Sequence, residues 1–134
     1  GVARLAQRFS GREPVSVFYQ IWERPLMTIS GAHMISAWLR LCGGRNVFAG
    51  LPELAPVVSL EAVLAADPQV IIAGRYPGKS SDWQRPWRAW SELRAVVGGH
   101  LYTVPAEMME RHTPRALVAA EELCDYIERA RGGL

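Results

Sequence analysis

The sequence predicts an α/β fold, a three-layer α/β/α lobe around a mostly parallel, Rossmann-like sheet of about four strands. The first observation behind this prediction is that short apolar runs alternate with amphipathic segments along the chain. The second is that glycine, proline or a helix-capping residue separates one run from the next. The third is size: 134 residues, 49% hydrophobic and 21% charged, suit a single compact domain.

Buried strands are expected where apolar and β-branched residues run together. Residues 15–21 (VSVFYQI), 70–73 (VIIA) and 101–104 (LYTV) have this composition. Residues 46–48 (NVF) are expected as a short extended piece. Because helical segments separate these runs, the strands are expected to lie mostly parallel.

Helices are expected between the strands, with recognisable signals at their ends. Ser30 and Gly31 are expected to open a helix that reaches Leu41, and the glycines after it supply a left-handed cap. Ser59 is a favourable N-cap for a helix over residues 60–66.

The final helix is expected to start at Pro114, after the capping residue Thr113, and to reach about Arg129, since proline suits the first helical position.

Several classes of function leave no trace in the sequence. The net charge is +2 and the basic residues are scattered, so no nucleic-acid surface is expected. No apolar run approaches the roughly 18 residues of a membrane span. The three histidines lack metal-ligand spacing, and neither a nucleotide-binding glycine motif nor a GxSxG elbow occurs. We therefore expect no catalytic residue, no metal and no cofactor.

The loops that follow the strands are where a ligand is expected, because open α/β sheets bind ligands beyond the carboxyl ends of their strands. The loop over residues 22–30 carries Trp22 and Met27, a polarizable apolar pair suited to a flat or bulky ligand. The alternative is that both side chains pack back onto the domain.

The loop over residues 105–113 is the second candidate. Its Glu107 and Arg111 can give hydrogen bonds and a guanidinium to an amide-rich or carboxylate ligand. The alternative is a solvated charged turn.

Three tryptophans, Trp83, Trp87 and Trp90, recur at spacings of four and three, which places them on one face of a helix. We interpret this as core packing of a surface helix over residues 82–93 that covers the sheet.

Two cysteines, Cys42 and Cys124, each lie near the C-terminal end of an apolar helical pattern. Their spacing leaves two readings open: two buried free thiols, or a disulfide that implies an oxidising compartment.

Taken in order, three stretches of the sequence resemble the C-terminal lobe of class III periplasmic binding proteins of ABC importers, and within that family the cobalamin (vitamin B12) carriers. They are VFYQIWERPLMTISGAHMISAWLRLCGGRNVF, PVVSLEAVLAADPQVIIAG and ERHTPRALVAAEELC. The resemblance covers about residues 15–126.

The resemblance implies an architecture of two lobes joined by a long helix, with the ligand held between the lobes. Residues 1–13 would be the end of the inter-lobe helix and a linker, which accounts for the helical pattern of residues 2–9. Residues 14–134 would be the C-terminal ligand-binding lobe, with the N-terminal lobe absent. The location would be periplasmic, with the signal peptide upstream of this sequence.

The resemblance also implies the partners: a cobalamin-like or other bulky metal-chelate ligand, and an ABC permease. Met27 falls where the carriers place an aromatic cleft residue. Glu107 and Arg111 match their acidic residue, an aspartate there, and their arginine. One position departs from the pattern, because a cleft tryptophan of the carriers aligns near Ala55, although Trp22 could fill similar space.

Two further positions take roles from the resemblance. Glu61 matches the surface glutamate that docks onto the permease; alternatively, it is a plain acidic residue in the positive first turn of its helix. Cys42 and Cys124 match cysteines that form a disulfide in the cobalamin carriers.

Other functions stay open. A ferric-siderophore or haem carrier of the same family is the nearest alternative. A small flavodoxin-like intracellular enzyme or regulatory domain is an alternative of another class, and a pure interaction module is a third.

Overall fold

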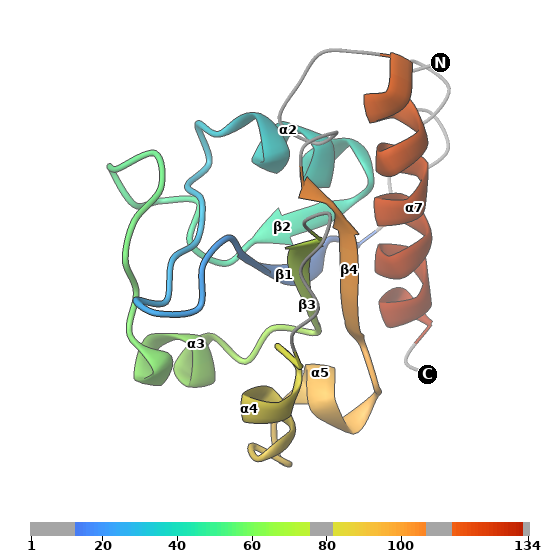
Figure 1. Ribbon diagram of the computed structural model, residues 1–134. Helices are drawn as coiled ribbons and strands as arrows, with labels where there is room; N and C mark the ends of the chain where they lie inside the picture. Colours follow the sequence, from blue (N-terminus) through green and yellow to red (C-terminus); the bar gives the residue numbers. More distant parts are fainter. Residues whose placement is uncertain (1–12, 76–81, 107–113, 133–134) are drawn as a thin grey trace.

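The computed structural model describes residues 13–75, 82–106 and 114–132, and the structural statements that follow concern these residues. Their centre is a four-stranded, all-parallel sheet in the order β2-β1-β3-β4 (Figure 1). The strands are β1 Val15–Gln20, β2 Gly44–Asn46, β3 Val70–Arg75 and β4 Leu101–Pro105. The predicted α/β class and parallel sheet are confirmed.

The central strand β1 shows why this sequence forms a covered sheet. All six of its residues are buried. Val17 and Tyr19 face one side and Phe18 faces the other, because successive strand residues alternate. A strand buried on both faces is mostly apolar, and in β1 only Ser16 and Gln20 depart from this pattern.

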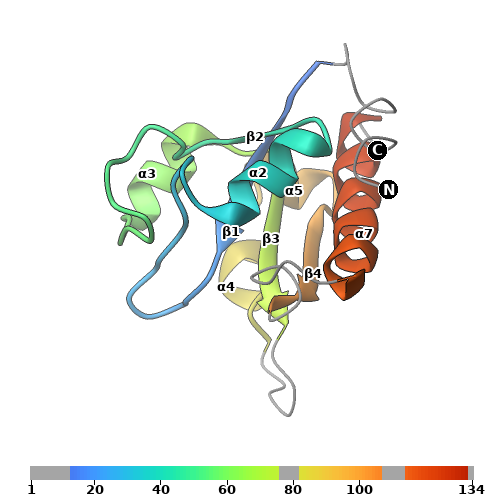
Figure 2. The same ribbon diagram turned by 90° about the horizontal axis from the view of Figure 1, so that it is seen from above.

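Helices α2 (Met34–Leu41) and α7 (Pro114–Arg131) cover one face of the sheet. Helices α3 (Leu60–Ala66), α4 (Arg85–Arg88) and α5 (Arg94–Val97) cover the other. Figure 2 shows α7 running alongside β4. The result is the predicted three-layer lobe.

The prediction that Ser30 opens α2 is wrong. The helix begins at Met34, and its N-cap is His33, whose Nδ1 accepts from the Ile35 amide at 3.0 Å. The Ser30 amide instead donates to the Leu54 carbonyl at 3.0 Å, so this residue belongs to a ladder with a distant segment. The predicted end of the helix is confirmed, since Gly43 adopts a left-handed φ of 81°.

The Trp-rich segment is not the single helix that was predicted. The chain turns after the four-residue α4, and Leu93 is extended, with ψ 133°. A second short helix, α5, starts at Arg94, whose amide donates to the Asp67 carboxylate at 2.9 Å. A residue distant in sequence thus fixes the start of α5, so local periodicity cannot reveal it.

A disulfide joins Cys42, at the end of α2, to Cys124 in α7. Both residues are fully buried in the core on this face of the sheet. The pairing implied by the resemblance is therefore present.

No helix in the described part of the chain is long and apolar enough to cross a membrane. The expected helix over residues 2–9 lies outside the described residues.

Candidate ligand-binding site at the carboxyl end of the sheet

The chain leaves β1 and immediately folds back as a tight hairpin. Trp22 and Met27 form an antiparallel bridge, in which the Met27 amide donates to the Trp22 carbonyl at 3.1 Å. The Ile21 amide donates to the Met27 carbonyl at 3.0 Å, and the Trp22 indole N–H donates to the Arg24 carbonyl at 2.9 Å. These bonds fix the hairpin at the carboxyl end of β1.

The returning arm of the hairpin pairs on its other side with a segment that precedes α3. Met27 forms a second antiparallel bridge with Val57. Around that bridge the amides of Thr28 and Ser30 donate to the carbonyls of Pro56 and Leu54, each at 3.0 Å. We call this pairing of residues 26–30 with residues 54–58 the rim ladder.

Trp22, Met27 and Val57 consequently form a row across three chain segments, which we call the apolar row. Directly opposite residues of an antiparallel pair point to the same side, with Cβ atoms about 5 Å apart. Trp22 is 50% exposed and Val57 61%, while Met27 is half-buried. The structure thus brings Trp22 and Met27 together and leaves half of the Trp22 surface exposed; a role of either residue in ligand binding stays a prediction.

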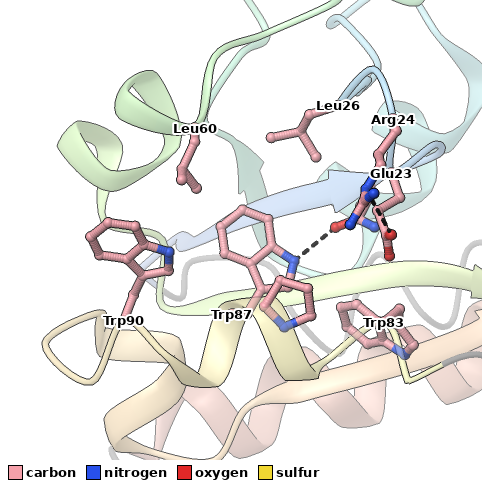
Figure 3. A pocket seen from close by; sticks show the side chains of 9 residues that line it. Glu23, Arg24, Leu26, Leu60, Trp83, Trp87 and Trp90 are labelled. Atoms are coloured by element: carbon pink, nitrogen blue, oxygen red, sulfur yellow. Dashed lines mark hydrogen bonds and ion pairs between the residues drawn. The ribbon is translucent and has the colours of Figure 1, made fainter.

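A groove of about 210 Å³ lies beside the hairpin (Figure 3). Leu26 lines it from the hairpin and points away from Met27, because successive ladder residues alternate. Side chains from the ends of neighbouring elements complete it: Gln20, Glu23, Arg24, Leu60, Trp83, Pro86, Trp87 and Trp90.

One hydrogen bond fixes the floor of this groove. The Trp87 indole N–H donates to the Gln20 side-chain oxygen at 2.8 Å, and Gln20 is the last residue of β1. The groove therefore opens at the same end of the sheet as the apolar row. At the groove the charged pair Glu23 and Arg24 lies 3.6 Å apart and is solvent-exposed.

The three tryptophans share this groove but differ in burial. Trp87 is buried in the core on its face of the sheet, and Trp83 packs partly against that core. Trp90 is 38% exposed. The predicted core packing thus describes Trp87 best, because the helix that would bury all three is only one turn long.

Glu61 is exposed in the first turn of α3, where the Ser59 hydroxyl caps the helix by accepting from the Ala62 amide at 3.1 Å. Its position suits both readings of this residue, so a docking role stays a prediction. Glu107 and Arg111 lie outside the described residues, and their ligand-binding role also stays a prediction.

Sequence reasoning missed Val57. Its place in the row depends on a pairing with Met27, and the two residues are far apart in sequence. The apolar pair at positions 57 and 58 was the only local hint. Within the described ranges no cluster of three or more His, Cys, Asp or Glu side chains could hold a metal ion.

Comparison with known proteins gives relatives that are longer than this chain. No family model matches it. A vitamin B12-binding protein of Vibrio cholerae serotype O1 is 36% identical over 128 residues, which are 95% of this chain and 45% of that protein. The chain thus spans about half the length of the curated relatives it matches.

Solved structures agree with this. The periplasmic vitamin B12-binding protein of Vibrio cholerae superposes with a TM-score of 0.83 at 34% identity, over 97% of this chain and 50% of that one. A possible iron-binding periplasmic protein of Staphylococcus epidermidis gives a TM-score of 0.80 at 20% identity, over 94% of this chain and 50% of that one. The second likeness concerns the fold alone.

Proposed function

Starting from the homology of this chain to vitamin B12-binding proteins over about half their length, we propose that it is the C-terminal ligand-binding lobe of a substrate-binding protein for an ABC importer. In this proposal residues 1–13 end the inter-lobe helix, and a second lobe completes the cleft. The observation that carries the proposal is the exposed apolar row at the carboxyl end of the sheet.

The ligand we propose is cobalamin or a related bulky metal chelate. Two steps of about 5 Å give the apolar row a length of roughly 10 Å, which suits a broad, partly apolar ligand face. Glu107 and Arg111 follow β4 and would add polar contacts at the same edge. Binding is reversible and involves no bond chemistry, so the lobe needs neither a catalytic group nor a cofactor.

One lobe supplies only part of the ligand's surroundings, because sites of this kind bury most of the ligand's surface. We therefore expect the isolated chain to bind weakly and the two-lobed protein to bind well. The buried disulfide supports a periplasmic location, since disulfides persist in oxidising compartments.

The deciding experiment is a calorimetric titration of the two-lobed protein with cyanocobalamin, haem and a ferric siderophore in turn. We expect saturable one-to-one binding of cyanocobalamin. Binding of haem or the siderophore alone would reassign the ligand within the same transport role. No binding of any of the three would contradict the proposal.

Glu61 is the proposed contact with the permease. Glu61→Arg should leave cyanocobalamin affinity unchanged and reduce uptake by cells, because it reverses the charge of the proposed permease contact, and Glu61 lines neither the groove nor the apolar row. Glu121→Arg, at an exposed carboxylate of α7, is the matched control and should transport normally. Normal uptake by the Glu61 variant would rule out the docking role.

A further inference from the structure

We infer that Asn46 is a positioning residue of the ligand site: its buried side chain holds the hairpin arm of the rim ladder, residues 26–30, and so keeps the apolar row together. Asn46 is the last residue of β2 and is only 5% exposed, so it does not itself reach the ligand surface. The role of the apolar row in ligand binding rests on the proposed function. The role of Asn46 in holding the rim ladder does not depend on it.

The side chain of Asn46 makes three hydrogen bonds to three different segments. Its Nδ2 donates to the Ile29 carbonyl at 2.6 Å and to the Ser36 hydroxyl at 2.9 Å. Its Oδ1 accepts from the Phe48 amide at 2.8 Å. One residue thus ties the returning arm of the hairpin, helix α2 and the start of the segment that leads to Val57.

The bond to Ile29 matters most because of where Ile29 lies. Its neighbours Thr28 and Ser30 are the two residues of the hairpin arm whose amides donate across the rim ladder. Ile29 is fully buried, so its carbonyl relies on Asn46 rather than on bulk solvent for this bond. Loss of Asn46 would therefore free the ladder at its centre.

We call residues 29–31, which lead from the hairpin toward α2, the connector. The bonds around it show that side chains, rather than regular secondary structure, hold it in place. The Ser30 carbonyl accepts from the Ser36 hydroxyl at 2.7 Å, and the Gly31 carbonyl accepts from the Arg40 guanidinium at 3.1 Å. Asn46 links to this set through Ser36. Three consecutive carbonyls of the connector are thus held by three side chains from β2 and α2.

Asparagine suits this position because the site needs two donors and one acceptor from one short side chain. Aspartate has nearly the same shape but offers only acceptors when ionised, and its oxygen would face the Ile29 carbonyl. Asn46→Asp therefore separates loss of the donors from loss of packing, and Asn46→Ala removes both.

The first test is amide hydrogen exchange of this chain, read at Thr28, Ser30 and Val58, the three donors of the rim ladder. In Asn46→Ala and Asn46→Asp these three amides should exchange at least about tenfold faster than in the wild type, after the change seen at the amides of β3 has been subtracted. The matched control is Gln69→Ala, which removes a polar latch at the opposite end of β1, where the Gln69 side-chain oxygen accepts from the Ser16 amide at 3.0 Å.

Equal protection of the three ladder amides in wild type and variants, or an equal loss in the Gln69→Ala control, would overturn the inference. If both Asn46 variants fail to fold, Ser36→Ala is the less disruptive variant. It should speed amide exchange at Ser30 first, because the Ser30 carbonyl loses its hydroxyl donor.

The second test is cyanocobalamin affinity of the two-lobed protein at a temperature where every variant is folded. Asn46→Ala and Asn46→Asp should weaken binding at least about tenfold, and Gln69→Ala should leave it unchanged. Unchanged affinity in the Asn46 variants would overturn the link to binding. Absence of binding by the wild type would overturn the proposed function instead, while the exchange experiment would still decide the role of Asn46.

Discussion

Trp22 and Val57 expose half or more of their surface, so they can be truncated with little effect on folding. Trp22→Ala and Val57→Ala should each weaken cyanocobalamin binding by the two-lobed protein about 10- to 100-fold, as expected for a large apolar side chain buried by the ligand. Calorimetric titration measures the affinity.

The control for these two variants is Val97→Ala, at a valine of α5 that is 73% exposed and lies outside the apolar row. It should bind like the wild type. Equal affinity of all three variants and the wild type would show that the apolar row does not contact the ligand.

Tyr126 is the residue from which a pH dependence can be predicted. Burial, the hydrogen bond to Glu122 and the charge of Glu122 raise the pKa of Tyr126 to about 12, from an ordinary value of 10.0. Its hydroxyl donates to the Glu122 carboxylate at 2.7 Å. The folded state therefore holds this proton more tightly than the unfolded state does.

The sign of the effect follows. Below pH 10 the phenol is protonated in both states and its contribution to stability is complete; that contribution is lost as the pH rises from about 10 to about 12. Tyr126→Phe should lower the free energy of unfolding at neutral pH. It should also make the fall in that free energy between about pH 10 and about pH 12 less steep. Urea unfolding at a series of pH values measures both, and an unchanged alkaline decline would contradict the assignment.

At the scale of elements, the outer strand β4 has a protected edge in the described part of the chain. The Leu101 carbonyl accepts from the Gln84 side chain at 3.1 Å, and the Thr103 carbonyl accepts from Arg75 at 3.2 Å. Pro105 has no amide to offer. These features occupy two outward carbonyls and remove one amide donor that another strand could use for pairing.

Removal of the two caps together should therefore promote self-association. The double variant Arg75→Ala, Gln84→Ala is expected to show concentration-dependent oligomers by analytical ultracentrifugation. Arg45→Ala, at an exposed arginine of the opposite outer strand β2, is the control and should match the wild type. A double variant that sediments like the wild type would show that the caps are dispensable.

The elements also show how far sequence reasoning reaches. β1 and β3 were predictable because a strand buried on both faces is mostly apolar and rich in β-branched residues. α3 was predictable from Ser59, a local cap. α5 was not, since the carboxylate that fixes its start belongs to Asp67.

The same contrast holds for the site. Trp22 and Met27 lie in one loop and could be found together, whereas Val57 joins them only through long-range pairing. Asn46 gave no signal of its role, because all that marks it is three bonds made in the fold. Local patterns thus predicted the layers, and contacts between distant segments decided the details of the site.

At the scale of the whole molecule, the disulfide joins α2 to α7 across a sequence separation of 82 residues. A bond that closes a loop of this length typically stabilises a domain by about 2–5 kcal/mol, chiefly by restricting the unfolded chain. Reductant should lower the urea midpoint accordingly. The double variant Cys42→Ala, Cys124→Ala should start from the lower midpoint and not respond to reductant; a wild type insensitive to reductant throughout its transition would contradict the prediction.

The separation of the two cysteines in sequence also determines when the disulfide can form. All of β2, β3 and β4 lie between the two cysteines, so Cys42 leaves the ribosome long before its partner exists. The bond can only be made once almost the entire sheet has been synthesised, so it cannot guide strand pairing in a chain that is still incomplete. Until Cys124 has been added to the chain, Cys42 carries a thiol without its native partner, and that thiol is open to coupling with other molecules.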